Sequence, residues 1–186
     1  MTDPSLLRSH AAARQVLAAT SSDQLGLATP CEKWSVADLI DHLVGAQDWG
    51  YAGLTGSDAG SAAGVWSGDY VTAFDESAAR VLALTDDAEV MAKTVNPGFG
   101  DMPAPALVGM ITSDTLVHAC DLAVATGQDR DLDPELAEQL LARAKESIPD
   151  SFRDPEGNIF GLEQDAPVNA CAADRLAAFL GRTVPS

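Results

Sequence analysis

The segment from about residue 104 to 126 constrains the fold more than any other part of the chain. It follows VNPGFGDMPAP, a stretch rich in Pro and Gly that predicts a turn or crossover, and it ends at TGQD, where Gly127 is a good helix cap. Apolar residues recur in it at i, i+3 and i+4, and Leu116 and Ala123 occupy the side opposite this stripe. The segment therefore predicts one long helix that is apolar nearly all round.

The rest of the chain is also dominated by Ala and Leu, with little alternation of β-branched residues, so helices should carry the fold. The other helices that we expect cover about residues 5–19, 35–54, 67–85, 133–148 and 169–180. Residues 55–64, TGSDAGSAAG, have the composition of a flexible loop, and any strands should be short and lie in the irregular stretches. Four long helices with a crossover predict an all-α four-helix bundle, a single domain over residues 1–186 with additional C-terminal helices packed against it.

Composition and charge narrow the classes of function. The chain has 186 residues, enough for one domain with a continuous core, and it carries 11 basic against 28 acidic residues, a formal charge of −17. That charge repels phosphate backbones and anionic lipid, so we expect neither nucleic acid nor a membrane as a partner. Three separated cysteines without a CxxC spacing favour reduced thiols, and we find no signal peptide or membrane-spanning run. We therefore expect a soluble, cytoplasmic protein.

Two polar residues interrupt the apolar stripe of the segment 104–126. Asp114 and His118 are four residues apart, so a helix places them one turn apart on the same side. A buried carboxylate needs a partner, a proton or a metal, and a carboxylate–imidazole pair at this spacing can present two ligands to one cation. An Asp–His hydrogen bond, or a more exposed helix face, explains the same spacing, and the spacing by itself leaves these alternatives open.

His42 is a third candidate, but it lies on the flank of the apolar stripe of the segment 35–54, where a histidine is more often packed or solvated than a ligand. Asp38 also precedes a histidine by four residues. Ser35 followed by Asp38 resembles a capping box, however, so we assign Asp38 to capping. His10 stands among Ala and Arg near the start of the chain, and for it we expect a surface position.

The cysteines are weaker candidates for chemistry. Cys120 is two residues from His118 and about 200° round the helix, so it should not bind the same cation, and we expect a buried, inert thiol. Cys31, in TPCEKW, would be reactive if it were exposed near a helix start, although a structural thiol is the simpler interpretation. No Gly-rich phosphate loop follows a strand, and no G-x-S-x-G elbow occurs, so the sequence offers no motif for phosphate binding or a serine triad.

Three ordered motifs, TPCEKWSVADLIDHLVG, DTLVHACDLAVATGQD and ADRLAAFLGR, resemble those of one family. This family comprises the metal-binding domain of mycothiol-dependent maleylpyruvate isomerase and its relatives, within the DinB-like superfamily. The resemblance covers the chain from near its start to the terminal helix. It implies a four-helix bundle that holds a divalent metal, zinc or nickel, with His42, Asp114 and His118 as its ligands.

The resemblance also implies a function. Three protein ligands leave open positions for water or substrate, as in a catalytic rather than a structural zinc site, and such a metal lowers the pKa of a bound thiol or water. We therefore hypothesise a metal-dependent transferase or isomerase that uses a low-molecular-weight thiol of the mycothiol type, with a small molecule as its other substrate. Asp121 would be either a partner behind the ligands or a helix-surface contact. The alternative is a metal-binding bundle without turnover, which acts as a sensor or small-ligand-binding module.

The sequence departs from the family pattern at three points. Relatives often carry Trp where Cys120 stands, and some carry Glu where Asp114 stands. The isomerase has an additional domain after the bundle, and none follows in these 186 residues, so the resemblance implies the metal site more directly than isomerase activity. The substrate, the physiological metal and the oligomeric state, with a homodimer as one option, stay open.

Overall fold

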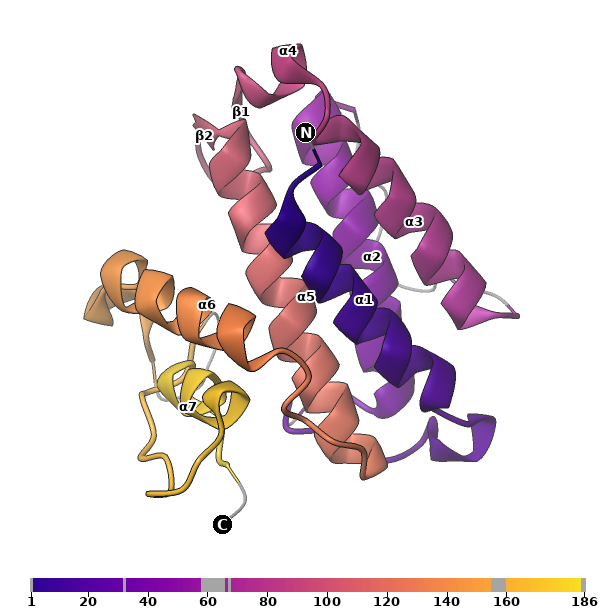
Figure 1. Cartoon of the computed structure of the whole chain (residues 1–186), viewed down its shortest axis with the longest axis vertical. Helices are drawn as coiled ribbons and strands as arrows, with labels where there is room; N and C mark the ends of the chain where they lie inside the picture. Colours follow the sequence, from indigo (N-terminus) through magenta and orange to yellow (C-terminus); the bar gives the residue numbers. More distant parts are fainter. Residues whose placement is uncertain (1, 32, 58–65, 67, 155–159, 185–186) are drawn as a thin grey trace.

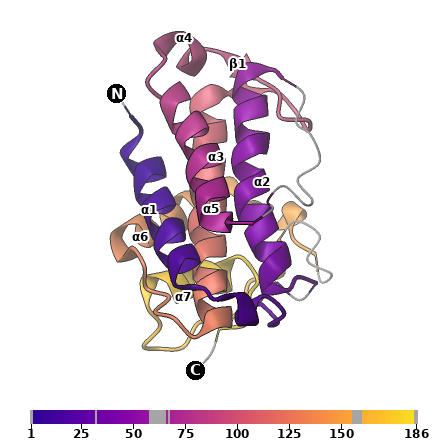
Figure 2. The same ribbon diagram turned by 90° about the vertical axis from the view of Figure 1, so that its right-hand side faces the viewer.

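The computed structural model describes residues 2–31, 33–57, 66, 68–154 and 160–184. Its elements in chain order are α1 (Pro4–Ala19), η1 (Ser22–Gln24), α2 (Val36–Thr55), α3 (Tyr70–Leu84), α4 (Ala88–Met91), β1 (Thr94–Val95), β2 (Met102–Pro103), α5 (Ala104–Thr126), α6 (Pro134–Ser147), η2 (Asp150–Phe152) and α7 (Ala172–Phe179). In this described part, α1, α2, α3 and α5 are the long helices of a bundle, and α6 and α7 pack together beside α1 and α5 (Figures 1 and 2). The predicted all-α bundle with additional C-terminal helices is confirmed.

Local signals in the sequence explain where the bundle helices begin and end. The Asp3 carboxylate accepts the backbone N–H groups of Ser5 and Leu6 at the start of α1. Ser35 and Asp38 form the predicted capping box at the start of α2. Gly127 ends α5 with a left-handed φ of 70°, as its position predicts. The predicted segments 5–19, 35–54 and 104–126 therefore agree with α1, α2 and α5 to within one residue at each end.

The structure differs from the expectations at other boundaries. The helix expected from about residue 67 begins at Tyr70, because the Asp69 carboxylate accepts the N–H groups of the first turn. The terminal helix, expected over 169–180, begins only at Ala172, after a turn in which the Ala170 N–H donates to Pro167. The short helix α4 was not predicted. Residues 58–64 of the predicted flexible loop lie outside the described residues.

Helix α5 lies at the centre of the core. Its buried side chains belong to three hydrophobic groups. The first packs against α6 and α7, the second against the C-terminal half of α1 and the N-terminal half of α2, and the third against the crossover that contains β1. This burial on several sides confirms the expectation that the helix is apolar nearly all round. Met110 also follows the i, i+3, i+4 spacing of the apolar stripe, which predicts that it faces the core, but it is 41% exposed. No membrane-spanning run was expected, but helix α5 is long and apolar enough to cross a membrane by length and composition. Of its most apolar window, 72% is buried inside the protein.

Two glycines of α2 allow α5 to approach closely. A Cβ atom at Gly50 would lie 2.4 Å from Ile111 Cδ1, and one at Gly53 would lie 2.8 Å from Leu107 Cδ2. Both positions are within four turns of His42 on the same helix. The close approach of α2 to α5 therefore helps to bring side chains from these two helices together.

Ion pairs attach the C-terminal region to the bundle, and a close backbone contact lies within that region. Arg8 of α1 binds Asp133 at the start of α6, and Arg182, after α7, binds Asp121 of α5. Gly181 has a φ of 93°, and a Cβ atom there would lie 2.4 Å from the Cα of Gly161. Any side chain at position 181 would therefore meet both backbone strain and a backbone clash.

We expect Gly181→Ala to lower the free energy of unfolding by about 1–3 kcal/mol, because it combines a left-handed φ with contact against backbone atoms that cannot rotate away. Urea denaturation measures this change. Gly109→Ala is the matched control, since Gly109 lies in α5 with nothing within 4 Å of an added Cβ, and alanine favours a helix. Equal stabilities of the two variants would contradict the prediction.

Candidate metal centre

Helices α2 and α5 bring the three predicted ligands together. His42 comes from α2, and Asp114 and His118 stand one turn apart on α5. The His42 Nε2 atom lies 3.0 Å from Asp114 Oδ2 and 3.3 Å from Asp114 Oδ1. The His118 Nε2 atom lies 3.4 Å from Asp114 Oδ1. One donor atom from each residue therefore converges on a single position, with the three atoms within 4.8 Å of one another.

The donor set fits a divalent metal of the zinc or nickel type. Ligands about 2.0–2.1 Å from a tetrahedral zinc ion are roughly 3.4 Å apart, close to the observed nitrogen–oxygen separations. Two imidazoles and one carboxylate are also ligands that such cations accept. The His118 side chain is 11% exposed, but those of His42 and Asp114 are 28% and 34% exposed. The donor set is therefore partly exposed on the side of His42 and Asp114.

Without a cation, the Asp114 carboxylate has to accept hydrogen bonds from protonated nitrogens of the two imidazoles. Burial disfavours ionisation of Asp114, but the charge of His118 and the hydrogen bonds from His118 and His42 outweigh it and lower the pKa of Asp114. Burial likewise disfavours the charged form of His118, but Asp114 and Asp121 outweigh it and raise its pKa well above the usual value. The group thus favours a positive charge beside Asp114, which a metal ion would also supply.

Asp121 fixes the orientation of the His118 ring. Its Oδ2 atom lies 3.0 Å from His118 Nδ1, on the side of the ring opposite the predicted ligand atom. Its carboxylate also accepts from Arg182 Nε at 2.9 Å on each oxygen. Asp121 is only 3% exposed, so the surface-contact alternative is wrong, and the carboxylate lies behind the His118 ring. A carboxylate on Nδ1 holds a proton there, so Nε2 is the nitrogen that would offer its lone pair to a cation.

The loop before α2 contributes two residues that the sequence reasoning did not place at this site. Trp34 packs on both imidazoles, with ring centroids 4.7 Å from His42 and 5.4 Å from His118. Cys31 Sγ lies 3.8 Å from His118 Nδ1. The Thr29 hydroxyl lies 2.9 Å from the Trp34 carbonyl and 3.1 Å from the Cys31 carbonyl, either of which can accept its proton, and its oxygen accepts the Cys31 N–H. Their closeness in sequence to the Ser35 cap was the signal that could have placed them near the start of α2.

The other titratable candidates lie elsewhere. His10 is 6% exposed and packs inside the bundle, so the expected surface position is wrong. Its apolar neighbours on α1 face the core, and the Nε2 atom of His10 finds Gln47 Oε1 of α2 at 2.9 Å. Cys120 is buried, as expected, and burial raises the pKa of its thiol, which agrees with the interpretation as an inert thiol.

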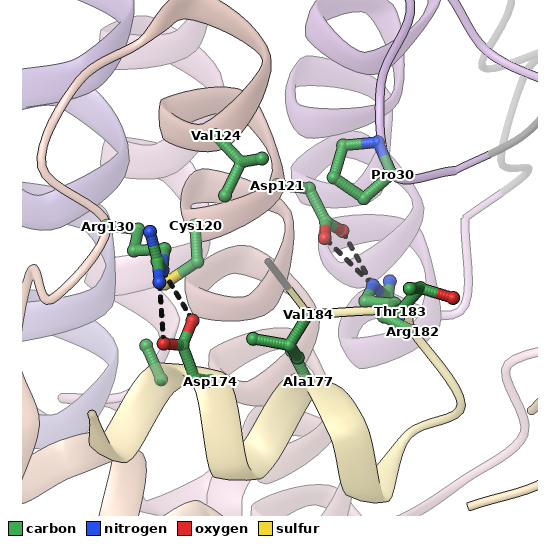
Figure 3. A pocket seen from close by; sticks show the side chains of 11 residues that line it. Pro30, Cys120, Asp121, Val124, Arg130, Asp174, Ala177, Arg182, Thr183 and Val184 are labelled. Carbon is green, nitrogen blue, oxygen red and sulfur yellow. Dashed lines mark hydrogen bonds and ion pairs between the residues drawn. The ribbon is translucent and has the colours of Figure 1, made fainter. Parts of the chain in front are cut away.

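A small pocket lies between the end of α5, helix α7 and residues 182–184 (Figure 3). Asp121 and Arg182 line one side of it, and the ion pair of Arg130 with Asp174 lines the other. None of the three predicted ligands lines this pocket. It therefore adjoins the residues behind His118 rather than the open face of the donor set.

Comparisons with known proteins agree with this architecture. The sequence model of the mycothiol maleylpyruvate isomerase N-terminal domain matches residues 6–123, which span α1 to α5 and contain His42, Asp114, His118 and Asp121. Two relatives named only as uncharacterized proteins, from two strains of Mycobacterium tuberculosis, are each 39% identical over 179 residues, or 91% of this chain and 91% of the relative. No solved structure matches the chain significantly. The chain belongs to the family of the mycothiol maleylpyruvate isomerase N-terminal domain.

Proposed function

We propose that the protein binds a divalent metal, zinc or nickel, through His42, Asp114 and His118, and that it acts as a metal-dependent transferase or isomerase. Its co-substrate is a low-molecular-weight thiol of the mycothiol type, in the cytoplasm. The convergence of three donor atoms from α2 and α5, with Asp121 on the far nitrogen of His118, is the observation that carries the proposal. Membership of a family named for a mycothiol-dependent isomerase supports the choice of thiol.

The chain's own residues have distinct parts in this proposal. Asp121 holds the Nδ1 proton of His118 and directs Nε2 to the donor position, while Trp34 covers the imidazole rings and keeps water from that side. A bound divalent cation would lower the pKa of a thiol at the open position. Asp114 and His42 stay partly exposed, so a thiol can reach the position beside them. The other substrate is a small electrophilic molecule.

Metal analysis tests the site. Purified protein supplemented with zinc or nickel should hold stoichiometric metal, and His118→Ala should lose it, because Asp114 and His42 alone leave one donor too few for a stable site. Asp38→Asn is the matched control, since Asp38 also precedes a histidine by four residues but caps α2 through Ser35. Near-zero metal in wild type and variant alike would sink the proposed site.

A thiol-conjugation assay separates an enzyme from a metal-binding bundle without turnover. The metal-loaded protein should accelerate transfer of mycothiol, or of a simpler thiol such as cysteine, to a small electrophile, and His118→Ala should not. If the wild type holds metal and no thiol changes its turnover, the sensor or small-ligand-binding module is the correct function.

A further inference from the structure

Cys31 lies on the side of His118 that faces away from the predicted ligands. Its Sγ atom is 3.4 Å from Asp121 Oδ2 and 3.9 Å from Arg182 Nη2, in addition to the 3.8 Å separation from His118 Nδ1. These three neighbours come from α5 and from the segment after α7, whereas Cys31 comes from the loop before α2. The Cys31 thiol therefore links the loop before α2 to the Asp121–Arg182 ion pair.

The chemistry of these neighbours determines where the thiol proton lies. An ionised carboxylate only accepts hydrogen bonds, and a guanidinium only donates them. The S–H of Cys31 therefore donates to Asp121 Oδ2, and its sulfur accepts from Arg182 Nη2. Asp121 Oδ2 receives three donors, from His118, Arg182 and Cys31, which together fix the rotation of the carboxylate.

The same residues form a second group of potential metal ligands, because Cys31, His118 and Asp121 each offer an atom within 4.8 Å of the others. Arg182 argues against a second cation there. Its guanidinium already contacts both Asp121 oxygens at 2.9 Å, and a cation would have to displace it from a carboxylate that is 4% exposed. Arg182 therefore already supplies the positive charge that the buried Asp121 carboxylate requires.

We propose that Cys31 is a positioning residue for the metal centre, which acts through Asp121 on the orientation of His118. This inference rests on the proposed metal site. Loss of the S–H donor frees Asp121 to rotate about its side-chain bonds, and His118 Nε2 then points less accurately at the donor position. Partners behind metal-binding histidines typically change metal affinity by about 10–100-fold.

Two substitutions test this role. Cys31→Ala should raise the dissociation constant for zinc about tenfold, measured by competition with a chromophoric chelator. Cys31→Ser retains a donor for Asp121 and should stay within about threefold of wild type. Cys171→Ala, which removes a thiol at the start of α7, is the matched control and should bind zinc like wild type. Equal affinities of the Ala variant and wild type, or equal losses in the Ala and Ser variants, would overturn the proposal.

Two further measurements separate this inference from the proposed function. Cobalt substitution should give no thiolate-to-metal charge-transfer absorption in wild type, and its appearance would make Cys31 a ligand instead. In the metal-free protein, the Nδ1 proton of His118 should give a slowly exchanging nuclear magnetic resonance signal that persists in Cys31→Ser and is lost in Cys31→Ala. An unchanged signal in Cys31→Ala would contradict the positioning role even if the protein bound no metal.

Discussion

Replacing Arg182 with methionine should lower the free energy of unfolding by about 3–5 kcal/mol and weaken metal binding in the same variant. The Asp121 side chain is 4% exposed, and Arg182 contacts both of its oxygens, so the substitution leaves a buried carboxylate with only His118, which it shares with Asp114, as a charged partner. Burial opposes the ionisation of Asp121, and its pKa stays low through the hydrogen bond from His118 and the charge of Arg182. Urea denaturation of the metal-free protein measures the loss of stability, and chelator competition measures the loss of metal affinity.

Arg130→Met is the matched control for this prediction. Arg130 donates through Nε and Nη2 to the two oxygens of a buried carboxylate, that of Asp174. The Arg130–Asp174 and Arg182–Asp121 pairs line the same small pocket (Figure 3). Its loss should destabilise the protein by a comparable amount, but metal affinity should not change, because Asp174 does not contact His118. If both variants lose metal equally, the effect comes from general destabilisation and not from the chain of contacts through Asp121.

A double variant separates charge from geometry. Asp121→Asn combined with Arg182→Met removes both members of the pair, so no unpaired charge remains and at least half of the lost stability should return. Metal affinity should stay low, since an asparagine holds the Nδ1 proton of His118 less firmly than a carboxylate does. Recovery of stability and metal affinity together would show that Asp121 has no part in orienting the histidine.

The sequence predicts the relative positions of residues that are close together along the chain. Asp114 and His118 share a helix face because they are four residues apart, and the capping box of Ser35 and Asp38 also depends on neighbours along the chain. Helix boundaries follow for the same reason. The position of His42 beside them required the family resemblance, because periodicity places that histidine only on the flank of its helix.

The contacts behind His118 are not visible to such reasoning. Arg182 is 61 residues from Asp121, and Cys31 is 87 residues from His118, so no helical period relates them. The family match ends at residue 123, before the segment that supplies Arg182. Packing of α6 and α7 against the bundle, with the close contact of Gly161 and Gly181, decides where that arginine lies.

His10 provides the other large expected effect, in the pH dependence of stability. Its Nε2 atom pairs with Gln47 Oε1, and Gln47 Nε2 donates to Thr115 Oγ1, so the bundle contains a buried polar chain across α1, α2 and α5. The Nδ1 atom of His10 is buried and has no hydrogen-bond partner among the residues that the structure describes. A proton added there would create an unsupported buried charge. Burial accordingly lowers the pKa of His10 to about 4, from 6.5.

The sign of the pH effect follows from this lowered pKa. Above about pH 6.5, His10 is neutral in both the folded and unfolded states, so its contribution to stability is at its full value. As the pH falls from 6.5 to 4, His10 binds a proton in the unfolded chain but stays neutral in the folded protein. The free energy of unfolding therefore decreases by about 3 kcal/mol over this range. His118 has a raised pKa, so its own contribution has the opposite sign: it is full below about pH 6.5 and is lost as the pH rises, equally in the wild type and in a variant of His10. Asp114 and Asp121 have lowered pKa values, so their contributions are lost only as the pH falls below the usual range of a carboxyl group.

His10→Gln should remove this slope, because an amide donates to Gln47 without titrating. Urea denaturation of the metal-free protein at half-unit steps from pH 7 to pH 4 should give a wild-type curve that falls by about 3 kcal/mol more than the curve of the variant. Parallel curves for wild type and His10→Gln would mean that the bundle admits a proton at His10, and that water reaches its Nδ1 atom between α1 and α2.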